Sequence, residues 1–247
     1  MKIKKIILSF LLLVFFAPSV FAQQEGNYLV YAVKHKVKPE KIDEYKELMK
    51  KFASACKEYN YPVRISAWQS ALPDFYYFYP IDGYNTIEQL RSEAWKIVPQ
   101  LGSDYAKKLF ETIESFDDFF IRGIDSLSYN PATSVDGLDY AEWWIHYYKT
   151  WTGGKYRNAF KQAVDIHKKS NYEYRIATFK DDIGMSGPAI ITVFWAKDPA
   201  DLYTHTGKAW ESLGEDVQTM INDFRSTTRK FEKIPFWRQK ELSYSPE

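Results

Sequence analysis

The stretch Asn60-Tyr61-Pro62-Val63-Arg64-Ile65 returns 111 positions later as Asn171-Tyr172-Glu173-Tyr174-Arg175-Ile176. Further matches follow at a shift of 115, where Ala94-Trp95 echoes Ala209-Trp210 and Leu127-Ser128-Tyr129 echoes Leu242-Ser243-Tyr244. The growth of the shift by four residues fits a longer turn in the second copy. The chain is therefore predicted to contain one unit of roughly 105 to 110 residues written twice.

The first 22 residues have the layout of a secretory signal peptide. Three lysines precede an apolar run over residues 6–16, and Val20 and Ala22 supply the small residues of a cleavage site before Gln23. A retained membrane anchor is disfavoured because a spanning helix needs about 20 apolar residues. The protein is therefore expected to be periplasmic or secreted, with no membrane attachment after cleavage.

Charge and cysteine content exclude some classes of protein. Without the first 22 residues the chain has 30 basic and 32 acidic residues, which is unlike the basic footprint of a nucleic-acid binder. Cys56 is the only cysteine, so no intramolecular disulfide can form. Aromatic residues make up 18% of the chain, which suits thick sheet packing or a pocket lined with flat rings. A small-molecule ligand is the expected partner, and the sequence leaves the oligomeric state open.

Hydrophobic periodicity predicts the same order of elements in both copies: strand, helix, strand, strand, helix, strand. The helical region before the last strand is interrupted in each copy. The first copy has predicted strands at 28–37, 63–70, 75–81 and 119–129 and helices at 42–59, 86–98 and 103–115. The second has strands at 140–149, 172–180, 189–196 and 231–244 and helices at 155–169, 198–213 and 215–226.

This order is that of the split βαβ, or ferredoxin-like, unit, whose helices cover only one face of its sheet. Two copies in one chain can close their uncovered faces on each other. The predicted fold class is therefore α+β, with two tandem ferredoxin-like (βαββαβ) units forming an intramolecular α+β barrel. The predicted segments are a signal peptide over 1–22, a first unit over 23–130, a connector over 131–138 and a second unit over 139–247.

Over residues 28–244 the chain resembles a fused form of the dimeric α+β barrel superfamily. The resemblance is based on the strand order, the repeat length and the repeated Asn-Tyr-x-x-Arg-Ile and Ala-Trp motifs. No catalytic signature contributes to this resemblance. The resemblance implies relatives of three kinds. These are cofactor-independent monooxygenases of the antibiotic-biosynthesis type, small-molecule binding proteins, and haem-using chlorite dismutases and dye-decolourising peroxidases.

Three of the four histidines fall in the second copy. His146 alternates with Glu142 and Trp144 on one face of a strand, and His167 and His205 occupy the apolar register of helices, so both are predicted to point inward. One interpretation is a site between sheet and helices built from Glu142, His146, His167 and His205. The other is that these histidines bond backbone carbonyls or tyrosine hydroxyls. No His-x₃-His or Glu-x-x-His pair indicates a metal, so no cofactor is expected, with haem on His167 as the alternative.

Arg64 and Arg175 match across the repeat and stand next to isoleucines on predicted strands. They can form a carboxylate clamp through the guanidinium fork, or an internal ion pair retained in both copies, and the ion pair is the preferred interpretation. Trp144 stands where the first copy has the smaller Val33, which makes it a candidate for a ligand contact specific to one half.

The leading hypothesis is an exported protein that binds a small, largely apolar or aromatic ligand in a cavity between sheet and helices. The first alternative is a monooxygenase of the antibiotic-biosynthesis type, with His146 and Glu142 as catalytic candidates, or a haem-dependent peroxidase-like enzyme. The second is a structural or interaction module without a ligand. The ligand-binding candidates are Arg64, Arg175, Trp144, His146, His167 and His205.

Overall fold

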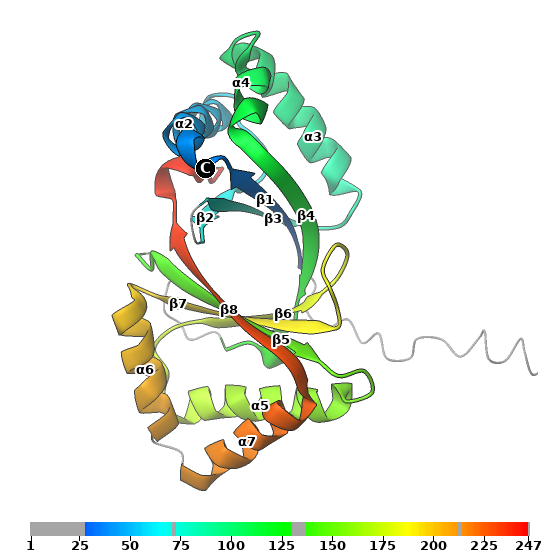
Figure 1. Ribbon diagram of the computed structural model, residues 1–247, viewed down its shortest axis with the longest axis vertical. Helices are drawn as coiled ribbons and strands as arrows, with labels where there is room; N and C mark the ends of the chain where they lie inside the picture. The colour runs from blue at the N-terminus through cyan, green and yellow to red at the C-terminus, as the bar shows by residue number, and fades with distance from the viewer. Residues whose placement is uncertain (1–27, 71–72, 130–136, 212–213, 247) are drawn as a thin grey trace, which may run out of the picture.

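The computed structural model describes residues 28–70, 73–129, 137–211 and 214–246 (Figure 1). The signal peptide predicted for 1–22 and most of the connector predicted for 131–138 lie outside these residues. Within these ranges, none of the helices combines the length and the apolar character that crossing a membrane requires.

Eight strands form one closed antiparallel barrel in the order β1-β3-β2-β8-β5-β7-β6-β4. Each half of the chain contributes four neighbouring strands with the same internal order, β4-β1-β3-β2 from the first half and β8-β5-β7-β6 from the second. The strands are β1 (Leu29–Val37), β2 (Ser66–Gln69), β3 (Asp74–Ile81), β4 (Ile113–Gly123), β5 (Tyr140–Tyr148), β6 (Ile176–Asp181), β7 (Ala189–Ala196) and β8 (Thr228–Arg238).

Six α-helices within the described ranges lie outside the barrel in two groups (Figure 1). The first half places α2 (Ile42–Glu58), α3 (Thr86–Ile97) and α4 (Tyr105–Thr112) over its own strands. The second half places α5 (Gly153–Lys169), α6 (Pro199–Glu211) and α7 (Gly214–Thr227) over the opposite side. In α2 the predicted apolar stripe is buried at Tyr45, Met49 and Cys56, because the spacing of three and four residues puts these side chains on the face that contacts the sheet.

The repeated Asn-Tyr motif ends a helix in each half. Asn60 has φ = 51° and Asn171 has φ = 49°, a left-handed conformation that asparagine tolerates better than most residues. The next residue then bonds back across the helix end: Tyr61 N donates to Cys56 O at 2.8 Å and Tyr172 N donates to His167 O at 3.0 Å. This is the Schellman type of helix ending, so the motif turns the chain from helix α2 or α5 toward the following strand.

The second repeated motif, Leu-Ser-Tyr, fastens each half to the other. Tyr129 of the first half bridges Ile176 of the second, and Tyr244 of the second half bridges Ile65 of the first. We call these two contacts, with the serines beside them, the crossed latches. Ser128 Oγ accepts a hydrogen bond from Thr178 N at 2.9 Å. Ser243 Oγ accepts one from Ala67 N at 3.0 Å.

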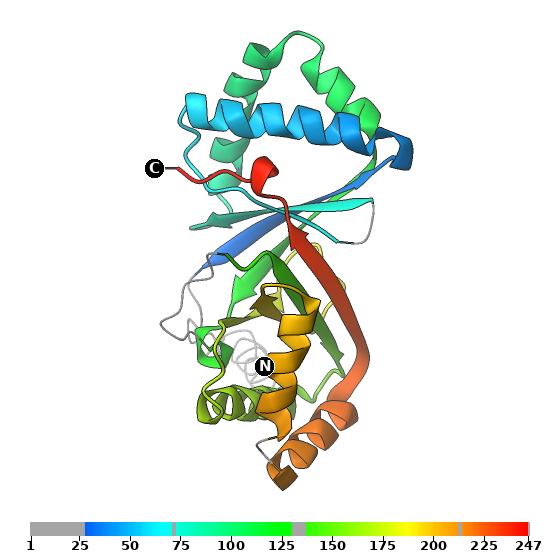
Figure 2. The same ribbon diagram turned by 90° about the vertical axis from the view of Figure 1, so that its left-hand side faces the viewer.

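The crossed latches strengthen seams that have few strand pairs. Between β2 and β8 only two residue pairs are in register, and between β4 and β6 there are three. Figure 2 shows the C-terminal segment leaving β8 and passing beneath α2 of the first half. The two halves therefore share backbone hydrogen bonds at both seams and beyond them.

The closing strands differ from their predicted ranges. Strand β4 spans Ile113–Gly123 instead of 119–129, and β8 spans Thr228–Arg238 instead of 231–244. Short 3-10 turns at Asp125–Leu127 and Lys240–Leu242 end the strands before the latches. The helix predicted over 103–115 overlaps the start of β4, where residues 115–118 are exposed and pair with β1 beyond the seam with β6.

Candidate functional site

The barrel encloses a cavity of about 220 Å³, which we call the lumen cavity. It exists because successive side chains of a strand point to opposite faces, so every second residue of each strand faces the barrel axis. Aromatic and aliphatic side chains make up most of its wall: Val30, Trp68, Phe78, Pro80, Ile121, Leu138, Ala141, Trp143, Phe179, Val193, Trp195 and Phe236.

One end of the barrel interior is filled with packed rings. The ring of Trp143 lies 5.1 Å from that of Phe78 and 5.2 Å from that of Phe236, and Tyr76 meets Phe236 at 5.0 Å. The lumen cavity therefore lies toward the other end, where β2 and β6 begin and β8 ends.

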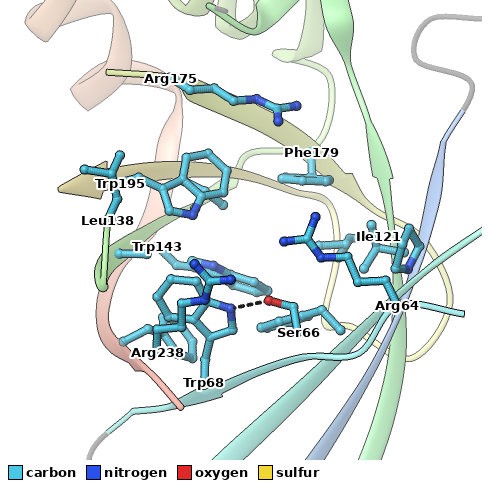
Figure 3. Close-up of a pocket in the computed structure, with 16 residues that line it drawn as sticks. Arg64, Ser66, Trp68, Ile121, Leu138, Trp143, Arg175, Phe179, Trp195 and Arg238 are labelled. Atoms are coloured by element: carbon cyan, nitrogen blue, oxygen red, sulfur yellow. Dashed lines mark hydrogen bonds between the residues drawn. The ribbon is translucent and has the colours of Figure 1, made fainter. Parts of the chain in front are cut away.

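Three arginines surround the lumen cavity at this end (Figure 3). Arg64 precedes β2, Arg175 precedes β6 and Arg238 ends β8. Figure 3 shows their side chains reaching toward the cavity from three sides, next to Trp68 and Trp195. The guanidinium of Arg175 lies over the Trp195 ring at 5.8 Å.

No ion pair joins any of these three arginines to a carboxylate within the part of the chain that the structure describes. The Nε atoms of Arg175 and Arg238 are buried and have no hydrogen-bond partner among the described residues. Burying a charged donor without a partner is costly. An anion supplied from outside would remove this cost, so the geometry favours an anionic ligand.

The preferred interpretation of Arg64 and Arg175 as an internal ion pair is wrong for the described residues, since both line the lumen cavity without a carboxylate. Arg64 and Arg175 lie on the inner surface because the turn after each Asn-Tyr motif sets the register of the following strand.

Arg238 is not among the site residues predicted from the sequence. At the shift of 115 its counterpart is Gly123, so no echo marks it. Its position two residues after the apolar Phe236, on the same face of a strand, is the signal that could have found it.

A second, smaller cavity of about 70 Å³ lies between the sheet and helices of the second half. Three of the predicted site residues, Trp144, His146 and His167, line it. His146 Nδ1, His167 Nε2 and Thr192 Oγ1 are buried there without a described hydrogen-bond partner. The structure thus brings His146 and His167 to one cavity, as the sheet–helix interpretation expected for these two.

Burial keeps both histidines of this cavity uncharged at neutral pH. His146 is enclosed by aromatic rings, with Phe231 at 4.6 Å and Phe160 and Phe224 at 5.3 Å, and this burial lowers the pKa of His146 to about 3. Burial likewise lowers the pKa of His167. His167 Nδ1 lies 2.6 Å from Ala163 O, so it donates to that carbonyl and its Nε2 is an acceptor directed elsewhere.

The structure places Glu142 and His205 outside the linings of both cavities. The Glu142 carboxylate is buried and accepts hydrogen bonds from Tyr140 and Tyr203, each at 2.9 Å, and from the Trp144 indole. His205, on α6, lies 3.2 Å from Glu173 and from Asp201. The four-residue site is therefore divided between separate places. Within the described ranges no group of three or more His, Cys, Asp or Glu residues is arranged to hold a metal ion.

Haem was the alternative cofactor, with His167 as its axial ligand. The unpartnered Nε2 of His167 is a suitable donor, but the cavity beside it measures about 70 Å³. Pockets that hold drug-sized molecules measure about 300–1,000 Å³, and a porphyrin belongs to that size class. The larger lumen cavity has no histidine or cysteine among its described lining residues. The residues present therefore do not fit haem in this arrangement.

No family model and no curated protein matches this sequence. Solved structures do match. A monooxygenase-like protein of Fusobacterium nucleatum superposes with a TM-score of 0.60 at 11% identity, covering 87% of this chain and 94% of that one. A monooxygenase-like protein of Lactobacillus acidophilus NCFM gives a TM-score of 0.58 at 8% identity, covering 89% and 97%. An anthrone oxidase-like protein gives a TM-score of 0.55 at 11% identity, covering 86% of this chain and 92% of that one. At these identities the likeness concerns the fold alone: the chain has a mixed α+β fold with a closed antiparallel barrel of eight strands, which matches these structures.

Proposed function

We propose that this protein binds a small anionic molecule with an apolar or aromatic body in the lumen cavity. The observation that carries the proposal is the convergence of Arg64, Arg175 and Arg238 on one aromatic cavity without a described carboxylate partner. The site differs from the sheet–helix location expected from the sequence, because the lumen cavity is the larger and the more basic of the two.

The wall and the arginines make different contributions to binding. An apolar body is stabilised by about 25 cal/mol for each Å² that it buries against the tryptophan and phenylalanine rings. The anionic group can form paired hydrogen bonds with a guanidinium, and these are stronger away from bulk water. A volume of about 220 Å³ suits a body of one or two rings, because it is below the range of about 300–1,000 Å³ for drug-sized ligands.

Two matched probes test the proposal: 2-naphthoate, which is anionic, and 2-naphthamide, its neutral counterpart. Binding is followed by isothermal titration calorimetry and by the fluorescence of Trp68, Trp143 and Trp195, which line the cavity. We expect naphthoate to bind at least about tenfold more tightly than naphthamide, a difference of about 1.4 kcal/mol. Arg175→Gln and Arg238→Gln are expected to weaken naphthoate binding by about tenfold or more and to leave naphthamide nearly unchanged.

Arg225→Gln is the matched control, because Arg225 is exposed on α7 and lines neither cavity. Equal binding of the two probes, or naphthoate binding that is unaffected by both cavity variants, contradicts the proposal. Thermal unfolding of each variant shows whether a loss of binding reflects a loss of fold.

Two further expectations accompany this proposal. We propose that the barrel consists of two tandem ferredoxin-like units, supported by the strand order β4-β1-β3-β2 and its repetition as β8-β5-β7-β6. We also propose that the protein is exported after removal of residues 1–22, supported by the lysines, apolar run and small residues of that segment. N-terminal sequencing of the protein recovered outside the cytoplasm is expected to begin at Gln23.

A cofactor-independent oxygenase activity in the sheet–helix cavity is the second candidate. It is favoured by the unpartnered nitrogens of His146 and His167, because both border the cavity and can form hydrogen bonds to a bound substrate. Oxygen uptake with hydroquinone tests it, because a cavity of about 70 Å³ excludes substrates of several rings. Uptake that His146→Phe abolishes supports this candidate, and no uptake above that of the substrate alone contradicts it.

A further inference from the structure

A polar recess of about 210 Å³ adjoins the lumen cavity and shares three of its lining residues, Arg64, Ser66 and Arg238. The rest of the recess comes mainly from the segment that follows β8, with Lys240, Ser243 and Ser245. Arg64 and Arg238 therefore face two spaces of opposite character, one aromatic and one polar. A ligand at this junction can place an apolar body in the first and a charged group toward the second.

The positive charge at the junction exceeds what a carboxylate neutralises. Lys240 is paired with Asp139 at 2.6 Å, but Arg64 and Arg238 have no ion-paired carboxylate within the described ranges. A carboxylate carries one negative charge. A phosphate monoester carries about −1.5 to −2 at pH 7 and presents three strong acceptor oxygens. Guanidinium groups suit phosphate because their planar N–H forks match its oxygens.

Ser66 adds a neutral donor at the same place. Its Oγ accepts the indole N–H of Trp68 at 2.8 Å, as Figure 3 shows, and no described residue accepts its own O–H. Ser243, by contrast, already donates to Gln239 O at 2.8 Å and accepts from Ala67 N. The hydroxyl that can turn to a ligand is therefore the one that lies between the two spaces.

The opposite side of the mouth holds Arg175, whose side chain interacts with Tyr28, but it has no second arginine equivalent to Arg238 among the described lining residues. The counterpart of Arg238 is Gly123, where an added Cβ would lie 2.3 Å from the ring of Tyr28. An aromatic ring thus lies beside the position equivalent to the Arg238 side chain. This asymmetry gives a bound molecule one orientation, with its charged group toward Arg64, Ser66 and Arg238.

Building on the proposed function, we propose that the ligand is a phosphate monoester of a small aromatic or apolar alcohol. Its phosphoryl group lies at the junction of the lumen cavity and the polar recess, between Arg64 and Arg238, and accepts the Ser66 hydroxyl. Its apolar body extends into the lumen cavity past Trp68 and Trp195.

Three probes with one naphthalene body test this assignment: 2-naphthyl phosphate, 2-naphthyl sulfate and 2-naphthoate. The phosphate and the sulfate have the same tetrahedral shape, but the sulfate stays a monoanion. At pH 7.5 we expect naphthyl phosphate to bind at least about tenfold more tightly than naphthyl sulfate. At pH 5.0 we expect a difference below about threefold, because the second ionisation of a phosphate monoester has a pKa of about 6. Near-ultraviolet circular dichroism confirms that the protein is folded at both pH values.

Two variants locate the phosphoryl group. Arg238→Gln is expected to reduce the preference for phosphate over sulfate to below about threefold, and Ser66→Ala to reduce it by a smaller factor. Arg225→Gln is expected to keep the full preference. Inorganic phosphate is expected to compete only weakly, because it lacks the body that fills the lumen cavity.

The outcomes separate this inference from the proposed function. If naphthoate binds and the phosphate and sulfate esters bind equally at pH 7.5, the phosphate assignment fails and anion binding in the lumen cavity stands. If no naphthalene anion binds, both fail. If inorganic phosphate binds as tightly as naphthyl phosphate, the lumen cavity does not hold the body of the ligand and the assignment is overturned.

Discussion

The two halves of the barrel use the same backbone fastenings but line their cavities with different side chains. Ser128 and Ser243 accept backbone N–H groups from Thr178 and Ala67, which are themselves equivalent at a shift of 111. The side chains that face the cavities have diverged, as Arg238 against Gly123 shows at the mouth of the lumen cavity. Positions that hold the sheets together are thus alike, whereas the lumen cavity combines a matched pair, Arg64 and Arg175, with positions that differ, such as Arg238 and Gly123.

The two halves also differ at the interface between sheet and helices, where each has a buried histidine. In the first half, His35 Nδ1 lies 2.8 Å from the hydroxyl of Tyr45, which also bonds the hydroxyl of Tyr77 at 2.7 Å. In the second half the equivalent His146 has no described partner for its Nδ1 and borders a small cavity. One histidine is thus part of a satisfied polar network, and the other is enclosed by aromatic rings alone.

Replacing Leu127 and Leu242, the leucines of the two Leu-Ser-Tyr motifs, tests the likeness of the halves and has the largest expected effect. Leu127 and Leu242 are 2% and 3% exposed, so Leu127→Ala and Leu242→Ala each remove a fully buried side chain. We expect each to lower the free energy of unfolding by about 2–5 kcal/mol, measured by urea denaturation. Losses that agree within about 1 kcal/mol support equivalent latches. A loss below about 1 kcal/mol in only one variant shows that the two halves are fastened differently.

The pH dependence of stability tests the difference between the histidines. Burial lowers the pKa of His35 to about 4 and that of His146 to about 3. Below pH 6.5 the unfolded chain protonates both while the folded chain does not, so the unfolded state binds more protons and stability falls as the pH falls. At pH 5.5 each histidine costs about 1.4 kcal/mol relative to neutral pH, and the loss ends near the folded pKa values.

Single replacements separate the two histidines. His35→Phe and His146→Phe are each expected to reduce the loss of stability between pH 7.5 and 5.5 by about 1.4 kcal/mol, measured by urea denaturation. At pH 7.5 they are expected to differ in sign. His146→Phe removes an unpartnered buried nitrogen and stabilises the protein by about 1 kcal/mol, whereas His35→Phe removes a partner of Tyr45 and destabilises it. Wild-type pH dependence in both variants contradicts the burial of uncharged histidines.

The latch serines provide the smallest effect. Ser128→Ala and Ser243→Ala each remove the acceptor of one backbone N–H group. We expect each to lower the free energy of unfolding by about 0.5–1.5 kcal/mol. Hydrogen exchange is expected to be faster at Thr178 in the first variant and at Ala67 in the second. Unchanged exchange at both amides means that these hydrogen bonds do not hold the latches closed.

Much of the fold could be predicted because its signals are local. The three- and four-residue spacing of apolar side chains predicted a helix over 42–59, and α2 spans Ile42–Glu58. A continuous apolar run predicted a strand over 189–196, and β7 has those bounds. The ends of β4 and β8 could not be predicted in this way, because they depend on pairing across the seams with strands of the other half.

The sequence by itself determined the repeat, the order of the elements and the presence of two matched arginines. The repeat is visible because the same residues recur at a fixed spacing. Helices and strands can be predicted because their apolar residues recur with a characteristic period over a short stretch of sequence. Only the tertiary structure decided that Arg64 and Arg175 meet Arg238 around one cavity, and that His205 and Glu142 lie apart from the cavity that His146 and His167 share. These relations depend on which faces of the strands point into the barrel and on how the helices pack against the outside of the sheet. The three arginines lie at least 63 positions apart in the chain, so no short sequence pattern indicates that they meet.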